Sequence, residues 1–356
     1  MSEQKMSDFL RDSLNDTLGT KGEGVAFRLD ESTPSTVKGY ISTGSCPLDI
    51  AISNTKDGGI PQGRLTEIAG MESIGKSLLG YHLIANCQKI GGTAILIDTE
   101  NAASIDIMKN VGVDTSALIY MQLETTEKVF AAMEHVIHQV RAKQKNIDTP
   151  LLIIWDSVAA TSTEAEFGKD VGEHTIALQA RIISKGLRKL TPFLGKYNVT
   201  LAFINQLRTR IGITFGDDKI TPGGKAIPFY SSVRLRLTKE GDLKTPSKKE
   251  VYGVAIKTMV KKNKIAPPFR KATFKLRFGK GIQDIESWFD ILVELKEVEK
   301  KGAWYSHAKL NGGTQFRSSA FVEHVKNAEM QGYFKDILED HFILKIERDD
   351  PEEIDE

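Results

Sequence analysis

The sequence predicts an α/β fold with a mostly parallel central sheet. Four short segments are expected to be strands, at residues 64–69, 93–100, 151–155 and 199–204, and the apolar run at 151–155 suits a strand buried on both faces. Between residues 37 and about 280, strands alternate with helical segments, and this alternation is typical of a parallel sheet. A glycine-rich turn joins the first run to a helical segment.

That turn matches the pattern G-x-x-x-x-G-K-[ST] of phosphate-binding loops. Its glycines let backbone N–H groups turn inward around phosphate, and the following helix, at 78–85, points its positive end there. Lys76 would reach the β- and γ-phosphates of a nucleotide, and the Ser77 hydroxyl would hold Mg²⁺. The alternative is a chance match, which the order of strand, loop and helix disfavours. The loop consists of Gly70, Met71, Glu72, Ser73, Ile74, Gly75, Lys76 and Ser77.

Acidic residues follow two of the other predicted strands. Asp156 ends the 151–155 run, where it would complete the Mg²⁺ site mostly through a water ligand. Glu100 lies at the carboxyl end of the segment 93–100. Because ligands of open α/β sheets bind beyond the carboxyl ends of the strands, Glu100 is a candidate to orient or deprotonate the attacking water. Asp98 is interpreted instead as a loop or capping acid.

The fourth predicted strand ends in the amides Asn205 and Gln206. An amide beside a γ-phosphate can distinguish ATP from ADP without adding charge. The alternative is a strand-end hydrogen-bonding residue with no signalling role. A long, basic, glycine-rich stretch at 207–225 follows, and such loops are usually functional or mobile. Joined to a phosphate sensor, it is a candidate nucleic-acid-binding loop switched by ATP.

The composition argues against several other classes of protein. The 356 residues carry a net charge of +1, and no apolar run approaches the roughly 20 residues of a membrane span. Cys46 and Cys87 are too few for a disulfide framework, and the seven histidines lack zinc-ligand spacing. Residues 347–356 carry seven acids and one arginine, a net of −6 that leaves +7 on the rest. Such a tail either competes with polyanions for a basic surface or merely solubilises the chain.

Several further stretches, together with the phosphate loop, resemble the RecA recombinase family of bacteria and phages. They cover most of the chain, and their combination is specific to this family, whereas the phosphate loop alone is not. The matching stretches are 41–45, 48–51, 70–77, 156–160, 180–181, 187–190, 203–206, 223–224, 229–235, 262–266 and 302–306.

The resemblance implies an ATP-dependent recombinase that forms helical filaments on single-stranded DNA and exchanges strands with homologous double-stranded DNA, in recombination and DNA repair. It implies ATP and Mg²⁺ as cofactors, with Glu100 activating water and Gln206 coupling the γ-phosphate to DNA. Lys262 and Lys264 would reach across a subunit interface to the neighbour's ATP, where cations offset charge on the transferring phosphoryl group. Single-strand-binding and mediator proteins are implied partners, in the cytoplasm of a bacterium or of a phage's host.

Two DNA-binding loops carry over from the resemblance, at 165–174 and 207–225. Arg188 would contact phosphate, and Ile211 would wedge between groups of bases, the alternative for Ile211 being a core position. The loops lack an aromatic pair for reading sequence, so binding should prefer single strands, tolerate most sequences and weaken with salt. The implied DNA-binding residues are Ile176, Arg181, Arg188, Arg208, Ile211, Gly223, Gly224 and Lys225.

The sequence departs from the family pattern at several positions. Met71 and Ile74 stand where the family usually has proline and serine, although neither side chain must contact phosphate. The acid and the tyrosine that the family uses near adenine correspond to Ser104 and Ile107, and loss of an aromatic face removes stacking of about 1 kcal/mol. Pro228 replaces a lysine near the subunit interface. The departures near adenine leave base selectivity open.

The sequence predicts that the chain is divided into four parts. In the first part, residues 25–29 have edge-strand character, and Phe27 would fill a neighbour's pocket by strand addition. Phe229 is the second oligomerisation residue. In the third part, the residues expected in the core are Trp288, Phe289, Trp304 and Tyr305. The parts are an oligomerisation segment at 1–36, an ATPase core at 37–280, a small α/β domain at 281–345 and an acidic tail at 346–356.

Two other functions use the same kind of core. One is a ring-forming ATPase motor such as a DNA helicase, and the other is an ATP-gated DNA scaffold with little turnover. The N-terminal plug, the two DNA loops and the pair Lys262 and Lys264 favour the recombinase over the helicase. Glu100 argues against the scaffold.

Overall fold

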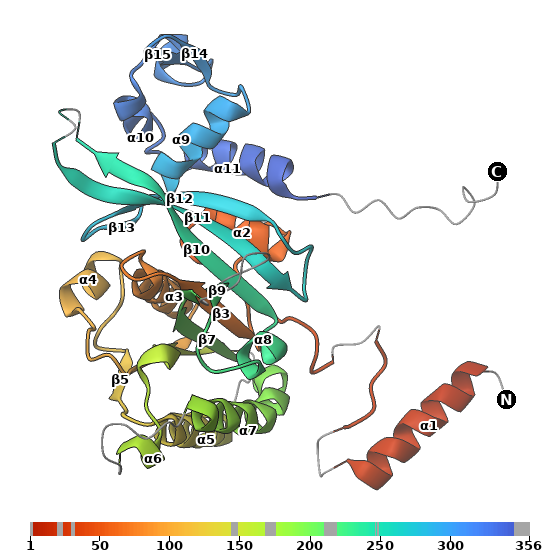
Figure 1. Cartoon of the computed structure of the whole chain (residues 1–356). Coiled ribbons are helices and arrows are strands. Elements are labelled where there is room, and N and C mark those ends of the chain that lie inside the picture. The colour runs from red at the N-terminus through yellow and green to blue at the C-terminus, as the bar shows by residue number, and fades with distance from the viewer. Residues whose placement is uncertain are drawn as a thin grey trace, which may run out of the picture. The chain divides into compact units, whose positions relative to one another are not determined.

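A computed structural model of the chain describes residues 3–19, 24–29, 33–143, 149–167, 176–209, 219–245, 247 and 249–344. The chain separates into two compact units, Met1–Val37 and Lys38–Glu356. The second unit contains the central sheet and the phosphate-binding loop (Figure 1).

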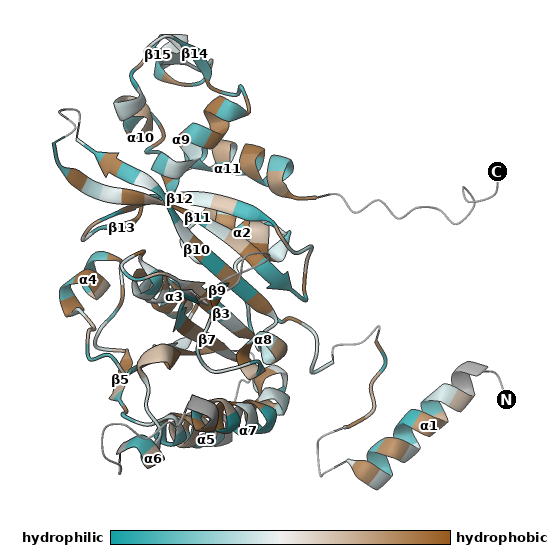
Figure 2. Ribbon diagram, in the orientation of Figure 1, coloured by the Kyte–Doolittle hydropathy of each residue, from teal (hydrophilic) through white to brown (hydrophobic). Residues whose placement is uncertain are grey.

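The first unit is built on the helix α1 (Glu3–Leu18), which carries both apolar and polar residues along its length (Figure 2). The Asn15 side chain accepts two backbone N–H groups of the segment 24–29, at 2.7 and 2.8 Å. The segment forms no strand within the single chain, and its addition to a neighbour stays a prediction. Phe27 is exposed, and so are the apolar residues of α1: Met6, Phe9, Leu10, Leu14 and Leu18.

The main sheet of the described residues has nine strands, in the order β13-β12-β11-β10-β3-β7-β6-β4-β5. Neighbours from β10 to β5 pair in parallel, and β11 to β13 extend the sheet in antiparallel fashion. The predicted α/β class is confirmed, and each of the four predicted strands lies within two residues of its expected ends. The strands are β3 (Leu65–Gly70), β4 (Thr93–Asp98), β5 (Ile119–Gln122), β6 (Leu151–Asp156), β7 (Val199–Gln206), β10 (Val233–Lys244), β11 (Val251–Asn263), β12 (Lys271–Arg277) and β13 (Gly281–Ile282).

Helices cover both faces of the sheet (Figure 1). In β6, Leu152 and Ile154 pack into one apolar cluster with α2, α3 and α4, whereas Ile153 and Trp155 pack into a second cluster with α5, α7 and α8. None of the helices in the described ranges is long and apolar enough to cross a membrane. The helices are α2 (Cys46–Ser53), α3 (Lys76–Lys89), α4 (Ile105–Asn110), α5 (Thr126–Lys143), α6 (Glu164–Phe167), α7 (Ile176–Lys196) and α8 (Ala226–Tyr230).

Short strands form separate two-stranded ladders beside the main sheet. The β10–β11 hairpin stays paired as far as Lys244 and Val251. The short ladders are β1 (Tyr40–Ile41) with β2 (Ile60–Pro61), β8 (Arg208–Thr209) with β9 (Lys219–Ile220), and β14 (Glu299–Lys301) with β15 (Trp304–Ser306).

Trp155 anchors the second apolar cluster. Its ring meets Phe130 and Phe203 edge-on, with centroids 5.8 and 5.0 Å away. Such aromatic pairs contribute about 0.5–1.5 kcal/mol beyond burial. The indole Nε1 donates to the Thr161 hydroxyl at 2.9 Å, so the buried ring also holds the turn that follows β6.

The C-terminal part has an apolar cluster of its own. Trp288 and Phe289 are buried in it as predicted, and Tyr305 packs on Phe289 with centroids 4.8 Å apart. The prediction is wrong for Trp304, which is 43 % exposed and lies under the Arg317 guanidinium, 4.0 Å from the ring centroid. Alternation along β15 turns Trp304 outward when Tyr305 turns inward. The helices here are α9 (Asp284–Glu294), α10 (Phe321–His324) and α11 (Ala328–Phe342).

His82 joins α3 to the far edge of the sheet. Its Nε2 accepts the N–H of Ile282 in β13 at 2.9 Å. Burial, with a smaller effect from Lys89, lowers the pKa of His82 to about 4, because the charged ring loses its hydration. Only a neutral imidazole has a ring nitrogen that can accept this hydrogen bond.

The contribution of His82 to stability should therefore be present above about pH 6.5 and be lost as the pH falls through about 4. Between these values the unfolded chain binds a proton that the folded chain does not. Urea titrations from pH 7 to 4 measure this effect. Over that range, the free energy of unfolding should fall by on the order of 3 kcal/mol less for His82→Gln than for the native chain. The exposed His135→Gln is the matched control, and parallel pH profiles for His82→Gln and the native chain would contradict the account.

Candidate functional site

The carboxyl ends of β3, β4, β6 and β7 meet at one edge of the sheet. Gly70 of β3 lies opposite Gln206 of β7, and Asp98 of β4 lies opposite Asp156 of β6. This edge borders a cavity of about 570 Å³. Side chains that the sequence assigned to phosphate chemistry line it together: Lys76, Ser77, Glu100, Asp156 and Gln206.

The loop between β3 and α3 folds around the start of the helix. Ser73 and Gly75 take positive φ angles of 57° and 84°, and α3 begins at Lys76 without a side-chain cap. Its first-turn N–H groups and its dipole therefore favour an anion at this point. The Lys76 ammonium donates to the carbonyl of Met71 at 2.6 Å, so its charge is held over the loop.

Ile74, one of the departures from the family pattern, supports the loop from inside. Its side chain is buried in the apolar cluster that includes α3. A Cβ added to Gly70 would lie 2.2 Å from Ile74 Cδ1, so any side chain at position 70 would displace the end of Ile74. Isoleucine at position 74 therefore changes the packing beneath the loop. Its side chain does not cover the side of the loop on which the backbone would face phosphate.

Asp156 is the most perturbed carboxyl of the cavity. Its pKa is raised to about 6, mainly by burial and also by the charges of Glu100 and Asp98, while a hydrogen bond from Ser77 and the charge of Lys76 oppose the shift. Burial in turn lowers the pKa of Lys76. The site therefore holds more buried negative charge than its lysine compensates, which favours a cation.

Glu100 and Asp98 have separate tasks at the end of β4. The Asp98 carboxylate accepts the N–H groups of Glu100 and Ala103, both at 3.0 Å, and the Tyr120 hydroxyl at 2.9 Å. Asp98 thus holds the loop that follows β4, the first of the two roles, loop or capping acid, that the sequence predicted. Glu100 is exposed to the cavity, and its carboxylate accepts the hydroxyl of Ser157.

The far end of the cavity has an aromatic residue that the sequence reasoning missed. Ser104 caps α4 by accepting the N–H of Ile107 at 3.4 Å. Neither a serine nor an isoleucine can supply an aromatic ring there. Phe278, which is 56 % exposed and precedes Gly279, lines this end. An aromatic residue next to a glycine directly after a strand is the signal that could have indicated it.

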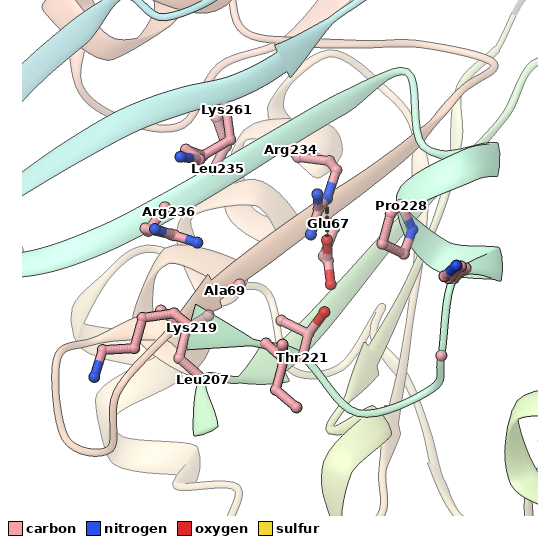
Figure 3. Close-up of a pocket in the computed structure, with 13 residues that line it drawn as sticks. Glu67, Ala69, Leu207, Lys219, Thr221, Pro228, Arg234, Leu235, Arg236 and Lys261 are labelled. Atoms are coloured by element: carbon pink, nitrogen blue, oxygen red, sulfur yellow. Dashed lines mark hydrogen bonds and ion pairs between the residues drawn. The ribbon is translucent and has the colours of Figure 1, made fainter. Parts of the chain in front are cut away.

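Asn205, the amide before Gln206, connects three segments, namely β7 itself, β3 and the end of the predicted second DNA loop. Its Nδ2 donates to Glu67 Oε1 at 3.1 Å and to the carbonyl of Pro222 at 3.0 Å. Glu67 is fully buried and accepts Arg234 Nε at 2.5 Å (Figure 3). A buried carboxylate needs such partners, so this cluster fixes where the stretch at 207–225 returns to the fold.

A second hollow, of about 350 Å³, opens beside this cluster. Figure 3 shows that basic side chains from β9, β10 and β11 line this hollow. The hollow therefore has more basic than acidic side chains in its lining, at the base of the predicted DNA loop. The basic residues lining it are Lys219, Lys225, Arg234, Arg236 and Lys261.

The predicted DNA-binding residues lie on three neighbouring segments. Arg181 and Arg188 are exposed on α7, two turns apart and thus on one side of the helix. Arg208 and Lys225 are exposed at the two ends of the predicted second loop. Residues 168–175 and 210–218, with Ile211, lie outside the described residues, as does the side chain of Ile176.

Lys262 and Lys264 do not line the phosphate cavity of their own chain. The Lys262 ammonium donates to the carbonyls of Pro228 and Phe229, at 2.7 and 2.9 Å, and Lys264 is exposed. Phe229 is 70 % exposed. The structure thus groups Phe229 with the two lysines that were expected to act on a neighbour.

A strand, a phosphate-binding loop and a helix within a mostly parallel sheet define a P-loop nucleotide-binding protein. The family described as the RecA N-terminal domain matches residues 9–283. The chain belongs to the RecA family, which confirms the resemblance seen in the sequence.

Relatives named "Protein RecA" match along most of their length. The protein of Gloeobacter violaceus is 42 % identical over 286 residues, 80 % of this chain and 73 % of the relative. That of Campylobacter jejuni subsp. doylei is 41 % identical over 325 residues, 89 % of this chain and 90 % of the relative. That of Trichodesmium erythraeum is 38 % identical over 322 residues, 90 % of this chain and 85 % of the relative.

Gly75→Ala should destabilise the fold more than a glycine replacement at an open site. Any side chain at a positive φ costs about 1 kcal/mol, and a Cβ at Gly75 would also lie 2.4 Å from Cδ1 of the buried Leu276. Gly91→Ala is the matched control, because Gly91 has a φ of +77° and nothing within 4 Å of an added Cβ. We expect Gly75→Ala to lose roughly 1–3 kcal/mol more than the control in urea titrations. Equal losses would show that Leu276 yields without cost.

Proposed function

We propose that this chain is an ATP-dependent recombinase that polymerises on single-stranded DNA and exchanges its strand with a homologous duplex. One observation carries the proposal: the phosphate loop, Glu100, Asp156 and Gln206 line one cavity, and β7 continues from it into the basic stretch that begins at Arg208. Membership of the RecA family supports the same function and gives no support to a ring-forming helicase.

The residues of the cavity fit a nucleoside triphosphate with Mg²⁺. Lys76 and the start of α3 would bind the β- and γ-phosphates, while Ser77 and Asp156 would hold the cation, mostly through water. The raised pKa of Asp156 supports this fit, because a nearby divalent cation would restore its ionised form. Bound magnesium would offset charge on the phosphate oxygens. No three acidic, His or Cys side chains of the described residues could hold a metal by themselves, as is usual for magnesium bound with phosphate.

Hydrolysis would use Glu100 as the general base. Its exposed carboxylate would accept a proton from the water that attacks the γ-phosphate, and the Ser157 hydroxyl would orient that carboxylate. Gln206, at the end of β7, would contact the γ-phosphate and move the adjoining stretch when the phosphate leaves. At the far end of the cavity, Phe278 would supply an aromatic face on which the nucleotide base can stack, because Ile107 has no ring.

DNA would be held mainly by its backbone. Arg181, Arg188, Arg208 and Lys225 would contact phosphates, with Ile176, Gly223 and Gly224 close to the strand and Ile211 wedged between bases. Affinity should therefore fall with salt through counterion release and depend little on sequence. The acidic residues 347–356 would compete with DNA for the same basic surface.

Assembly would place each nucleotide between two subunits. Phe27 would fill a pocket of one neighbour, while Phe229, Lys262 and Lys264 would face another subunit's nucleotide. The proposed parts are an oligomerisation segment (1–36), an ATPase core (37–280), a small C-terminal domain (281–345) and an acidic tail (346–356). Such a filament would act in the cytoplasm, with single-strand-binding and mediator proteins as further partners.

The chemical roles in the cavity are tested by three substitutions. Lys76→Ala should weaken ATP binding roughly 10- to 100-fold, because a charge-assisted hydrogen bond contributes about 1.5–3 kcal/mol. Glu100→Gln should bind ATP normally and lower kcat by about 10²–10⁴. The control is Glu72→Gln, a carboxylate of the same cavity that should leave kcat unchanged. A normal kcat for Glu100→Gln would remove the assignment of the base.

The proposed assembly is tested by electron microscopy with a non-hydrolysable ATP analogue and single-stranded DNA. The native chain should form helical filaments, and closed rings would support the motor instead. Phe27→Asp should shorten the filaments without lowering the melting temperature, because the side chain is exposed in the single chain. Phe27→Leu, which keeps an apolar plug, should retain them, and filaments of native length for Phe27→Asp would contradict the role of the plug.

A further inference from the structure

The turn after β6 is held by a side chain of α7, the helix that carries Arg181 and Arg188. This turn contains the short helix η1 (Val158–Ala160) and ends at Thr161. Gln179 of α7 donates its amide to two carbonyls of the turn, that of Val158 at 3.0 Å and that of Thr161 at 2.7 Å. One half-buried amide thus bridges both ends of the turn.

The same turn holds the end of β4 on its other side. The Thr161 hydroxyl lies 3.0 Å from the Thr99 hydroxyl and 2.8 Å from the carbonyl of Ser157. Thr99 and Ser157 exchange two further hydrogen bonds, at 2.9 and 3.0 Å, and the Ser157 hydroxyl donates to the Glu100 carboxylate. Hydrogen bonds, joined through the residues Thr161 and Ser157 themselves, therefore link Gln179 to the proposed general base.

The middle of the network is shielded from water. Ser157 and Thr161 are buried, and the fully buried Trp155 donates to the Thr161 hydroxyl at 2.9 Å. Hydrogen bonds in such surroundings are stronger and better ordered than exposed ones. A displacement at one end is therefore passed on as a change of geometry at the other.

The end of the predicted second DNA loop packs against the same elements. A Cβ added to Gly223 would lie 3.1 Å from Ile183 of α7 and 3.4 Å from Val158 of the turn. A Cβ added to Gly224 would lie 2.8 Å from Cβ of Ala180, the neighbour of Gln179. The two segments expected to contact DNA thus meet at the turn that holds Glu100.

We propose that Gln179 is a positioning residue that couples DNA contact at α7 to the orientation of Glu100. The inference rests on the proposed function, because it takes DNA at α7 and a general base at Glu100 as given. DNA that shifts the first turns of α7 moves the Gln179 amide, and the turn at 158–161 follows it. Ser157 then aims the carboxylate at the attacking water.

The test compares ATP turnover with and without single-stranded DNA in isosteric and truncated variants. Gln179→Met keeps the size of the side chain and removes both donors, and Gln179→Ala removes the chain beyond Cβ. Both should lower the DNA-stimulated kcat roughly 2- to 30-fold, the range for residues within a coupling network. DNA-free turnover, the Kd for ATP and the Kd for DNA should stay at native values. Gln331→Ala, which removes an amide-to-carbonyl hydrogen bond in α11, is the matched control.

A double substitution separates positioning from a general loss of stability. Ser157→Ala should lower turnover with and without DNA, and adding Gln179→Met to it should have little further effect, because both act on one carboxylate. Independent, multiplying effects would overturn the network. Native stimulation by DNA in both Gln179 variants would overturn it as well, and so would a weaker Kd for DNA that accounts for the whole loss. Absence of DNA stimulation in the native chain would instead overturn the proposed function, and the inference with it.

Discussion

The parallel pairing of β3, β7, β6 and β4 is the constraint on which the rest of the site depends. Parallel strands end at the same edge, so a phosphate loop, an amide and two acids from distant parts of the sequence reach one cavity. The pairing is held by apolar residues on both faces of each strand, as in β6. A one-residue slip of β6 would exchange its two faces and withdraw Asp156 from the cavity.

Buried polar contacts then connect this edge to the surfaces expected to meet DNA. Asn205 links Glu67 to the carbonyl of Pro222, where the second loop returns to the fold. Gln179 links α7 to the turn that follows Asp156. Both are neutral amides, which bond to two partners at once without adding charge to a crowded acidic site. Coupling between nucleotide and DNA would thus run through Gln206 of β7 and Gln179 of α7, while Asn205 fixes where the second loop returns to the fold.

Much of the fold and part of the site could be predicted from sequence. The four buried strands and the phosphate loop are local patterns, and the role of Asp98 in the loop after β4 follows from its place at a strand end. The contacts of Ser157, Gln179 and Phe278 could not be predicted, because each joins residues far apart in the chain. Trp304 shows the limit of composition, since a large aromatic residue can be exposed when a cation covers its ring.

The most direct measurement of the central claim is the affinity for labelled single-stranded DNA with a non-hydrolysable ATP analogue and with ADP. If the γ-phosphate site and the DNA surface are coupled, the analogue should bind DNA roughly 5- to 150-fold more tightly, the usual range of coupling between two sites. Gln206→Ala should bring the two affinities together while each nucleotide still binds. Equal DNA affinity of the native chain with both nucleotides would contradict the account.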